Sequence, residues 1–414
     1  VIQNIQDKKW RLEYMNKELL IKAGAVIVAM ILITTTMVAV LKRGEARHEM
    51  EQEAIAEAEA NSENASVASK PEVSAAAEPT EGIEMPATKN WPYEDDPTTT
   101  FDESKLRPIP GSDNLTPMED VEMHGVMCWG DSLTAGYMAR PEASYPSLLG
   151  SWLTSDGYNC NVVNMGATGE DSRAIAARAG GVGVYNHDDI TLISDGTPSE
   201  IILVDDTGTI INTQLHDSVG INPCTITDES GHSIELELKN TDVYTGYANY
   251  TIRPYSVNPE IFMPAHTPIK LQGATLNRDY LPVIFSGNNG GFKDLNEYIT
   301  QIDGIINDKD YNNLYIVVGI TMPGVVDFDE YDKVMEAAYG DHYLNFRKFL
   351  AEYDYTEFGY YPNEDDRNCY LHGDYSPWML ATDEKHFSEL NYSLLAKAVY
   401  QKIYELGYQE GFIK

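Results

Sequence analysis

Residues 126–137 read Val126-Met-Cys-Trp-Gly-Asp-Ser-Leu-Thr-Ala-Gly-Tyr137. In this stretch an apolar run typical of a β-strand stops at a Gly-Asp turn, Ser132 follows directly, and the next three residues are typical of the first turn of a helix. A sharp turn from strand to helix lifts a hydroxyl clear of the sheet and aims helix N–H groups at whatever docks there. The alternative is a serine that only caps the helix. We therefore expect an α/β fold in which most of the chain positions Ser132, completes its site or covers it.

The alternation of strand, polar loop and helix recurs on both sides of a central interruption. It is typical of a parallel sheet with helices on its faces. The expected strands are 121–129, 158–164, 281–287, 314–320 and a short one at 343–346. The expected helices are 146–153, 173–179, 293–307, 329–338 and 389–406, and residues 355–382 are expected to be irregular.

The interruption spans residues 183–275 and lacks helical periodicity. It holds short strand-like runs separated by Asp-Gly, Asp-Asp-Thr-Gly and Glu-Ser-Gly turns. We interpret Asp205-Asp206 and Asp228-Glu229 as parts of hairpin turns. The segment therefore predicts a small all-β module inserted into the α/β domain. Its expected strands begin at Ile190, Glu200, Thr209, Ile234 and Tyr250.

The chain is strongly acidic. Its 414 residues include 29 Lys and Arg against 65 Asp and Glu, a formal net charge of −36. A body this acidic repels phosphate backbones, which argues against nucleic acid as a partner. The 27 tyrosines, often in polar loops, are typical of surfaces that handle sugars or other polar polymers, and equally of a hydrated surface with no particular ligand. The sequence leaves the oligomeric state open.

Residues 23–41 contain no charged side chain and are apolar on all sides. At 1.5 Å per residue they cover about 28 Å, close to the hydrocarbon thickness of a bilayer. Basic residues are in modest excess before the segment, which favours a cytoplasmic location for residues 1–22. A cleaved signal peptide is the alternative, but no clear small-x-small site follows Leu41. We expect a single-pass transmembrane helix, with residues 1–22 in the cytoplasm and the chain from residue 42 onward outside the cell.

Residues 42–117 are the expected linker. They are charged, rich in Ala, Glu, Ser and Pro, and poor in aromatic side chains. Such a segment cannot bury enough apolar surface to fold and is typical of a solvated tether. It would keep a folded domain near the membrane and still let it reach into a cell wall.

The four cysteines show no CxxC or Cys/His spacing of the kind that binds a metal. Cys128 and Cys160 lie in apolar strand-like runs, where a buried free thiol is the default. A disulfide is the alternative for a protein outside the cell. The redox state therefore stays open for Cys128, Cys160, Cys224 and Cys369.

A serine hydroxyl needs a base to accept its proton before it can act as a nucleophile. Among nine histidines, His386 is the best candidate because it lies just before the last helix. Asp383 precedes it by three residues and could orient and stabilise the imidazolium. The alternative interpretation of Asp-x-x-His is a helix cap with an incidental histidine.

A tetrahedral intermediate also needs hydrogen-bond donors for its oxyanion. The N–H groups of Ser132 and Gly169 and the side-chain amide of Asn288 could supply three. A glycine at 169 lets the backbone approach a substrate without a Cβ clash. Asn288 lies in an Asn-Asn-Gly-Gly run that is equally typical of a β-turn. All these residues follow successive strands, and open α/β sheets bind ligands at the carboxyl ends of their strands.

Together these residues resemble the SGNH (GDSL) hydrolase family. The first family block is similar to Gly130-Asp-Ser-Leu-Thr-Ala-Gly136 and the second to Asn164-Met-Gly-Ala-Thr-Gly169. The third is similar to Ser286-Gly-Asn-Asn289, and the last, Asp-x-x-His, to Asp383 and His386. The similarity covers residues 120–172 and 281–408. The serine block is the most specific of the four.

The resemblance implies a flavodoxin-like three-layer α/β/α domain over residues 118–408. It implies Ser132 as nucleophile, His386 as base and Asp383 as its partner, with Ser132, Gly169 and Asn288 forming an oxyanion hole. It implies neither a metal nor a cofactor. The acidic run 363–366 could bind a cation, but we interpret it as a solvated loop.

Three positions depart from the family pattern. Ser286 and Asn289 stand where the third block usually has glycine and aspartate, and Glu170 stands where an aspartate usually follows the glycine. None of the three is the expected nucleophile or base, so we expect an active enzyme.

These features predict a membrane-tethered serine esterase that acts outside the cytoplasm on short acyl esters, most simply acetyl groups on cell-wall or other glycans. Two alternatives remain open. The same residues could transfer the acyl group to a sugar hydroxyl, or the chain could be a non-catalytic surface module that binds a glycan or a protein.

Overall fold

The computed structural model describes residues 121–213, 220–228, 230–240, 250–256, 260–276, 279–309 and 314–414. Within these ranges no helix has both the length and the apolar character needed to cross a membrane. The predicted transmembrane segment 23–41 and the predicted linker 42–117 lie outside the described residues.

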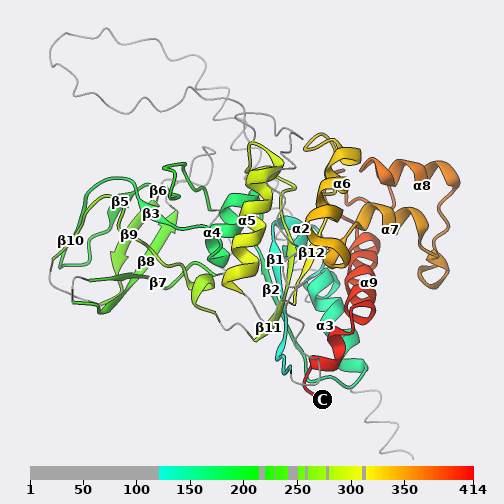
Figure 1. Ribbon diagram of the computed structural model, residues 1–414, viewed down its shortest axis with the longest axis horizontal. Helices are drawn as coiled ribbons and strands as arrows, with labels where there is room; N and C mark the ends of the chain where they lie inside the picture. Colours follow the sequence, from blue (N-terminus) through cyan, green and yellow to red (C-terminus); the bar gives the residue numbers. More distant parts are fainter. Residues whose placement is uncertain are drawn as a thin grey trace, which may run out of the picture. The chain divides into compact units, whose positions relative to one another are not determined.

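A parallel sheet of five strands lies at the centre of the α/β part, and Figure 1 labels β1, β2, β11 and β12 of it. The strand order is β13-β12-β11-β1-β2. β1 lies between two neighbours, with Cys128 opposite Val283 of β11 and Asn164 of β2. All six residues of β1 are buried, which explains its unbroken apolar sequence. The strands are β1 (Gly125–Gly130), β2 (Asn161–Gly166), β11 (Tyr280–Phe285), β12 (Ile316–Val318) and β13 (Tyr343–Leu344).

Helices cover both faces of this sheet. Successive side chains of a strand point to opposite faces. Val126 and Cys128 accordingly join the apolar cluster that holds α3 and α9, whereas Met127 and Trp129 join the cluster that holds α4, α5 and α6. This three-layer α/β/α order agrees with the expectation. The helices are α2 (Ser132–Ala135), α3 (Tyr145–Ser155), α4 (Ser172–Ala179), α5 (Leu295–Asp308), α6 (Phe328–Tyr339), α7 (Phe346–Glu352), α8 (Glu364–Leu371) and α9 (Glu389–Glu405).

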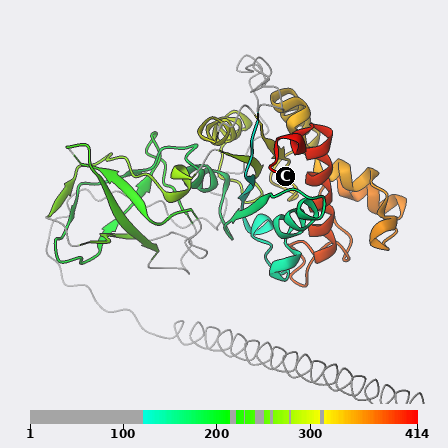
Figure 2. The same cartoon turned by 90° about the horizontal axis from the view of Figure 1, so that it is seen from below.

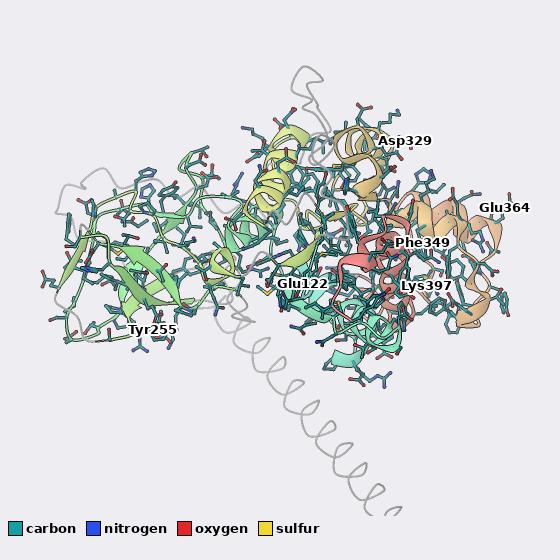
Figure 3. All side chains as sticks on the ribbon, turned by 60° about the horizontal axis from the view of Figure 1, so that its bottom comes forward. Glu122, Tyr255, Asp329, Phe349, Glu364 and Lys397 are labelled. Atoms are coloured by element: carbon teal, nitrogen blue, oxygen red, sulfur yellow. The ribbon has the colours of Figure 1, made fainter. Side chains whose placement is uncertain are left out.

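The last helix, α9, packs along α3 on one face of the sheet, and the two lie side by side in both views (Figures 1 and 2). α7 also contacts α9, and Figure 3 labels Phe349 of α7 and Lys397 of α9 on these neighbouring helices. The chain continues past α9 through η7 (Tyr408–Gly411), and Phe412 forms a parallel bridge with Met123. The packed part of the chain therefore extends beyond residue 408.

Between α4 and β11 the described residues form eight short strands and one 3-10 turn, η4 (Gln272–Thr275). Their pairings are antiparallel, in a four-stranded sheet of order β5-β9-β8-β7 and two strand pairs. These strands enclose an apolar cluster of their own, and Tyr255, just after β9, is exposed on this module (Figure 3). The strands are β3 (Tyr185–Asn186), β4 (Ile190–Leu192), β5 (Ser199–Ile201), β6 (Leu203–Val204), β7 (Cys224–Thr227), β8 (Ser233–Asn240), β9 (Tyr250–Pro254) and β10 (Ile261–Met263).

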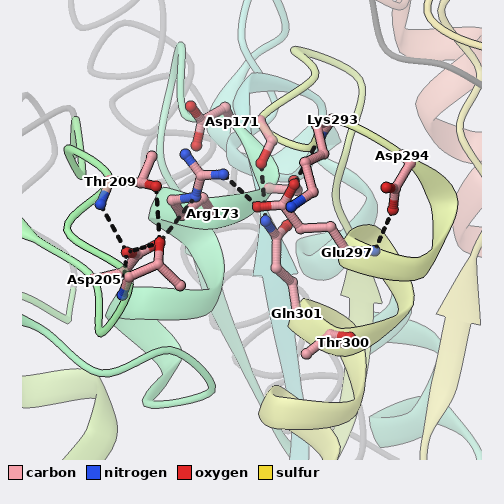
Figure 4. Close-up of polar contacts among 12 residues, drawn as sticks. Asp171, Arg173, Asp205, Thr209, Lys293, Asp294, Glu297, Thr300 and Gln301 are labelled. Atoms are coloured by element: carbon pink, nitrogen blue, oxygen red, sulfur yellow. Dashed lines mark hydrogen bonds and ion pairs between the residues drawn. The ribbon is translucent and has the colours of Figure 1, made fainter.

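Arg173 of α4 links this β-rich segment to the α/β part (Figure 4). Its Nε lies 3.4 Å from Oδ2 of Asp205, and its guanidinium also contacts Glu297 of α5. Asp205 in turn accepts hydrogen bonds from the backbone N–H groups of Thr207 and Thr209. The predicted turn at Asp205 is therefore present, and its carboxylate also has an ionic partner in the α/β part.

Three sequence-based expectations were wrong. No strand begins at Thr209, and Ile210 forms only an isolated bridge with Val204. The strand expected at 343–346 ends at Leu344, because Asn345 caps α7 by accepting a hydrogen bond from the N–H of Lys348. Residues 355–382, expected to be irregular, contain η6 (Tyr355–Phe358) and α8. Asn363 and Asp366 form a reciprocal capping box at the start of α8, so the acidic run is a helix N-terminus and not a solvated loop. Helix α8 was hard to predict because only Tyr370 of its side chains is buried.

All four cysteines are free thiols, and Cys369 alone is exposed. Burial raises the pKa of Cys128 and of Cys160 to about 12. Because the thiolate is the reactive form, these two side chains are inert packing groups at neutral pH.

Candidate active site

Ser132 is the first residue of α2, directly after the carboxyl end of β1. Asp131 caps this short helix, and its Oδ1 accepts a hydrogen bond of 2.8 Å from the N–H of Leu133. The turn is tight because α2 lies against β2: a Cβ on Gly166 would come within 2.1 Å of the backbone nitrogen of Ala135. Only glycine permits this approach, so the sequence of β2 helps to hold the serine in place.

His386 and Ser132 meet although they are far apart in the sequence. Nε2 of His386 lies 2.9 Å from Oγ of Ser132, and Nδ1 lies 2.6 Å from Oδ2 of Asp383. The segment that carries the histidine folds back on itself, since the N–H of Ala381 donates to the carbonyl oxygen of His386. Ser388 then caps α9. The three residues, predicted from two separate motifs, thus form one continuous hydrogen-bonded chain.

The Asp383 carboxylate is fixed on both oxygens. Oδ1 accepts hydrogen bonds from the backbone N–H groups of His386 and Lys385, at 3.0 and 3.2 Å, and Oδ2 faces the imidazole. Burial acts to raise the pKa of Asp383, but the hydrogen bonds from His386 and Lys385 together outweigh it, and the pKa lies below its ordinary value. The carboxylate is therefore charged and able to stabilise a protonated imidazole.

Asn288 lies beside the turn that carries Ser132, and two partners orient its amide. Its Oδ1 accepts from the backbone N–H and from Oγ1 of Thr321, at 2.9 and 3.1 Å. A backbone N–H can only donate, so the atom that faces it is the amide oxygen, and the NH₂ group points the other way. Nδ2 donates to Oδ2 of Asp131 at 3.3 Å. The NH₂ group carries a second N–H besides the one that bonds to Asp131.

Asp131 is fully buried beneath the site. Burial raises its pKa to about 7, against the opposing effect of hydrogen bonds from Leu133 and Asn288. A carboxyl group with this pKa changes protonation near neutral pH and borders both Ser132 and Asn288. The sequence pattern alone does not indicate this position, because a Gly-Asp pair is equally typical of an ordinary turn.

Gly169 lies on the loop that follows β2. That loop begins with a hydrogen bond of 3.0 Å from the N–H of Ala167 to the carbonyl oxygen of Gly130, so it starts beside the end of β1. Gly169 has a φ of 81°, in the left-handed region that favours glycine. Asn289 joins this loop to the loop after β11 that carries Asn288, because its Nδ2 donates to the carbonyl oxygen of Glu170 at 2.9 Å. The three predicted donors therefore belong to neighbouring loops at one end of the sheet.

Two contacts around the histidine were not foreseen. The ring of Tyr137 packs on the His386 imidazole with centroids 4.6 Å apart. Arg140 and Glu389 form a two-pronged ion pair, with Nε–Oε1 and Nη2–Oε2 distances of 2.8 and 2.9 Å. Both residues of the pair are exposed, so its contribution to stability is small. It does join the segment after the serine to the segment after the histidine.

Among the described residues, no group of three or more His, Cys, Asp and Glu side chains could hold a metal ion. In particular, the acidic run at the start of α8 engages in capping, with Asp366 accepting from the N–H of Asn363.

No protein-family model matches the sequence. No curated protein matches it either. Among solved structures, the chain is similar to a protein assigned to the G-D-S-L family of lipolytic proteins from Desulfitobacterium hafniense DCB-2. The two are 14% identical, the match covers 67% of this chain and 99% of that one, and the TM-score is 0.32. A likeness of this size carries no information about activity.

Proposed function

We propose that the chain is a serine esterase that works through an acyl-enzyme. One observation carries the proposal: Asp383, His386 and Ser132 form a continuous hydrogen-bonded chain that ends on a serine at the turn from β1 into α2. A carboxylate, an imidazole and a hydroxyl in this order constitute the arrangement that activates a serine as a nucleophile.

The first half of the reaction follows from these contacts. Nε2 of His386 takes the proton of Ser132 while Oγ attacks the ester carbonyl carbon. Asp383 stabilises the imidazolium that forms and keeps Nδ1 protonated through the 2.6 Å contact. Collapse of the tetrahedral intermediate breaks the bond to the alcohol oxygen, and His386 gives its proton to that leaving group.

Water completes the cycle. His386 takes a proton from a water molecule, the resulting hydroxide attacks the acyl carbon, and Ser132 leaves with the proton restored to Oγ. In both halves negative charge develops on the former carbonyl oxygen. We propose that the N–H groups of Ser132 and Gly169 and the NH₂ group of Asn288 stabilise this charge. Thr321 bonds to the amide oxygen of Asn288, so the NH₂ group points away from Thr321.

Substrate and location are further parts of the proposal. The acidic, tyrosine-rich body and the apolar segment 23–41 support a domain tethered to the outer face of the cell membrane. From there it would remove short acyl groups, most simply acetyl, from cell-wall or other glycans.

A fluorophosphonate probe tests the enzyme class directly. The full chain should be labelled on Ser132 and should hydrolyse p-nitrophenyl acetate. Ser132→Ala should lose both properties, whereas Ser151→Ala, an exposed serine on α3, should keep both. No label on Ser132, or equal turnover by Ser132→Ala, would refute the esterase and favour a binding module.

Two additional assays test the finer proposals. Incubation with an acetylated glycan and a free sugar acceptor separates hydrolysis, which releases acetate, from transfer, which acetylates the acceptor. Recovery of the full-length chain in the membrane fraction is expected for an anchor at 23–41, and recovery in the soluble fraction would contradict it.

A further inference from the structure

Arg178, in the last turn of α4, is a fully buried arginine that contacts the ends of two central strands. Its Nη1 donates to the carbonyl oxygen of Met165 on β2 at 2.8 Å, and its Nη2 reaches the carbonyl oxygen of Gly130 on β1 at 3.3 Å. Gly130 precedes Ser132 by two residues. The same guanidinium therefore ties together the two strands that lead into the serine turn and the glycine loop.

The same arginine also binds the residue next to Gly169. Nε and Nη2 of Arg178 both lie 2.8 Å from Oε2 of Glu170, and neither side chain is exposed. The main chain of Glu170 is held as well: its N–H donates to Ala167 at 3.3 Å, and its carbonyl oxygen accepts from Asn289 at 2.9 Å. Contacts from the side chain and from both main-chain polar groups thus fix the Gly169–Glu170 segment.

We propose that the buried Glu170–Arg178 pair, together with Asn289, positions the Gly169 N–H for the oxyanion. The inference rests on the proposed esterase function. It assigns a role to two of the three departures from the family pattern, Glu170 and Asn289. Neither side chain contacts the reacting atoms, so each acts as a positioning residue.

Physical chemistry explains why a buried ion pair, and not apolar side chains, suits the Glu170–Arg178 position. A buried ion pair adds little stability compared with apolar side chains of similar volume, because both charges lose their hydration. An arginine does have rigidly forked donors that fix several acceptors at once. Three acceptors, on Gly130, Met165 and Glu170, use that geometry here. Apolar replacements would fill the space without setting the direction of the loop.

A double variant separates positioning from folding. Single removal of Glu170 or Arg178 leaves a buried charge unpaired and is expected to unfold the domain. Glu170→Met with Arg178→Met removes both charges at similar volume, so the thermal midpoint should stay near that of the wild type and Ser132 should still titrate to completion with a fluorophosphonate. We expect kcat per titrated site on p-nitrophenyl acetate to fall by roughly 10- to 100-fold, with KM little changed, because the donor acts only on the oxyanion.

The affinity for a short alkyl boronic acid should fall in parallel, since the boronate occupies the oxyanion hole once it bonds to Ser132. Glu170→Asp, which keeps the charge, should retain more of the wild-type kcat than the double variant. A folded double variant with wild-type kcat and boronate affinity would overturn the proposal.

Asn289→Ala provides a second test that does not depend on the double variant folding. It removes the bond to the Glu170 carbonyl from a half-buried position, and kcat should fall about 10-fold with KM unchanged. Asn296→Ala, the same chemical change at a half-buried position on α5, should have wild-type kinetics. Equal kcat for Asn289→Ala and the wild type would overturn the role of Asn289. If the wild type itself neither labels nor turns over, the esterase proposal fails first, and that result is seen before any variant is made.

Discussion

Nε2 of His386 lies 2.9 Å from Oγ of Ser132, although the two residues are 254 positions apart in the sequence. The serine begins α2, just after the first strand of the central sheet, and the histidine lies in the segment before the last helix. Because α9 packs along α3, the last part of the chain lies near β1, the first strand in the sequence. The proposed proton transfer from Ser132 to His386 depends on this arrangement.

Replacement of His386 by alanine should lower kcat/KM for p-nitrophenyl acetate by about 10³-fold or more, because residues that act as a unit cannot be removed singly without losing most of the effect. The protein should stay folded, since the imidazole is partly exposed. His372→Ala, an exposed histidine at the end of α8, is the matched control and should be fully active. Retained activity in His386→Ala would mean that another residue is the base.

A graded series tests the oxyanion role of Asn288. Asn288→Ala removes the donor and should lower kcat by roughly 10²- to 10³-fold. Thr321→Val removes only the Oγ1 bond to Asn288 and keeps the backbone bond. We therefore expect transition-state stabilisation to fall by about 1 kcal/mol, which lowers kcat roughly fivefold. Steady-state kinetics on folded variants give both values. An effect on KM alone would assign Asn288 to substrate binding and not to the transition state.

Asp131 predicts a pH-dependent stability. Its pKa is about 7 in the folded protein against an ordinary value of 3.8, so between about pH 4 and pH 7 the folded state keeps a proton that the unfolded state has released. The free energy of unfolding should therefore fall as the pH rises through this window, by at most about 4 kcal/mol from this group, and its contribution should be constant above it.

Urea unfolding at several pH values measures this slope. Asp131→Asn should remove it, whereas Asp195→Asn, in an exposed turn, should leave it unchanged within the window. Parallel pH profiles for Asp131→Asn and the wild type would show that Asp131 is ionised in the folded protein throughout.

Gly166→Ala should destabilise the protein through a single contact. The new Cβ would lie 2.1 Å from the backbone nitrogen of Ala135, and backbone atoms cannot move aside without shifting α2. We expect the free energy of unfolding to fall by at least about 1–3 kcal/mol. Activity should fall as well, because α2 carries Ser132. Gly150→Ala in α3 meets only Val162 at 3.3 Å and gains helix propensity, so its effect should stay within about 1 kcal/mol. Thermal unfolding of both variants measures the difference.

Much of the fold could be predicted because strong local patterns accompany burial. The apolar runs at β1, β11 and β12 belong to strands that are buried on both faces, and the loops after them carry the polar residues. Helices α7 and α8 could not be predicted in this way. Only Asn345 separates α7 from a strand of two residues, and α8 buries only Tyr370, so neither has the apolar period of a long helix.

The sequence by itself determined which groups are available for the chemistry: a serine in a strand-to-helix turn, an Asp-x-x-His pair before a helix, and glycine and asparagine loops at strand ends. These are local patterns, and local backbone preferences are enough to produce them. Only the tertiary structure decided how they combine. The contact of Asp131 with Asn288, the orientation of that amide by Thr321, and the clasp of Arg178 around Gly130, Met165 and Glu170 all join residues from different elements. Such contacts arise from packing the layers of the sheet and its helices, and no short stretch of sequence contains the distances that define them.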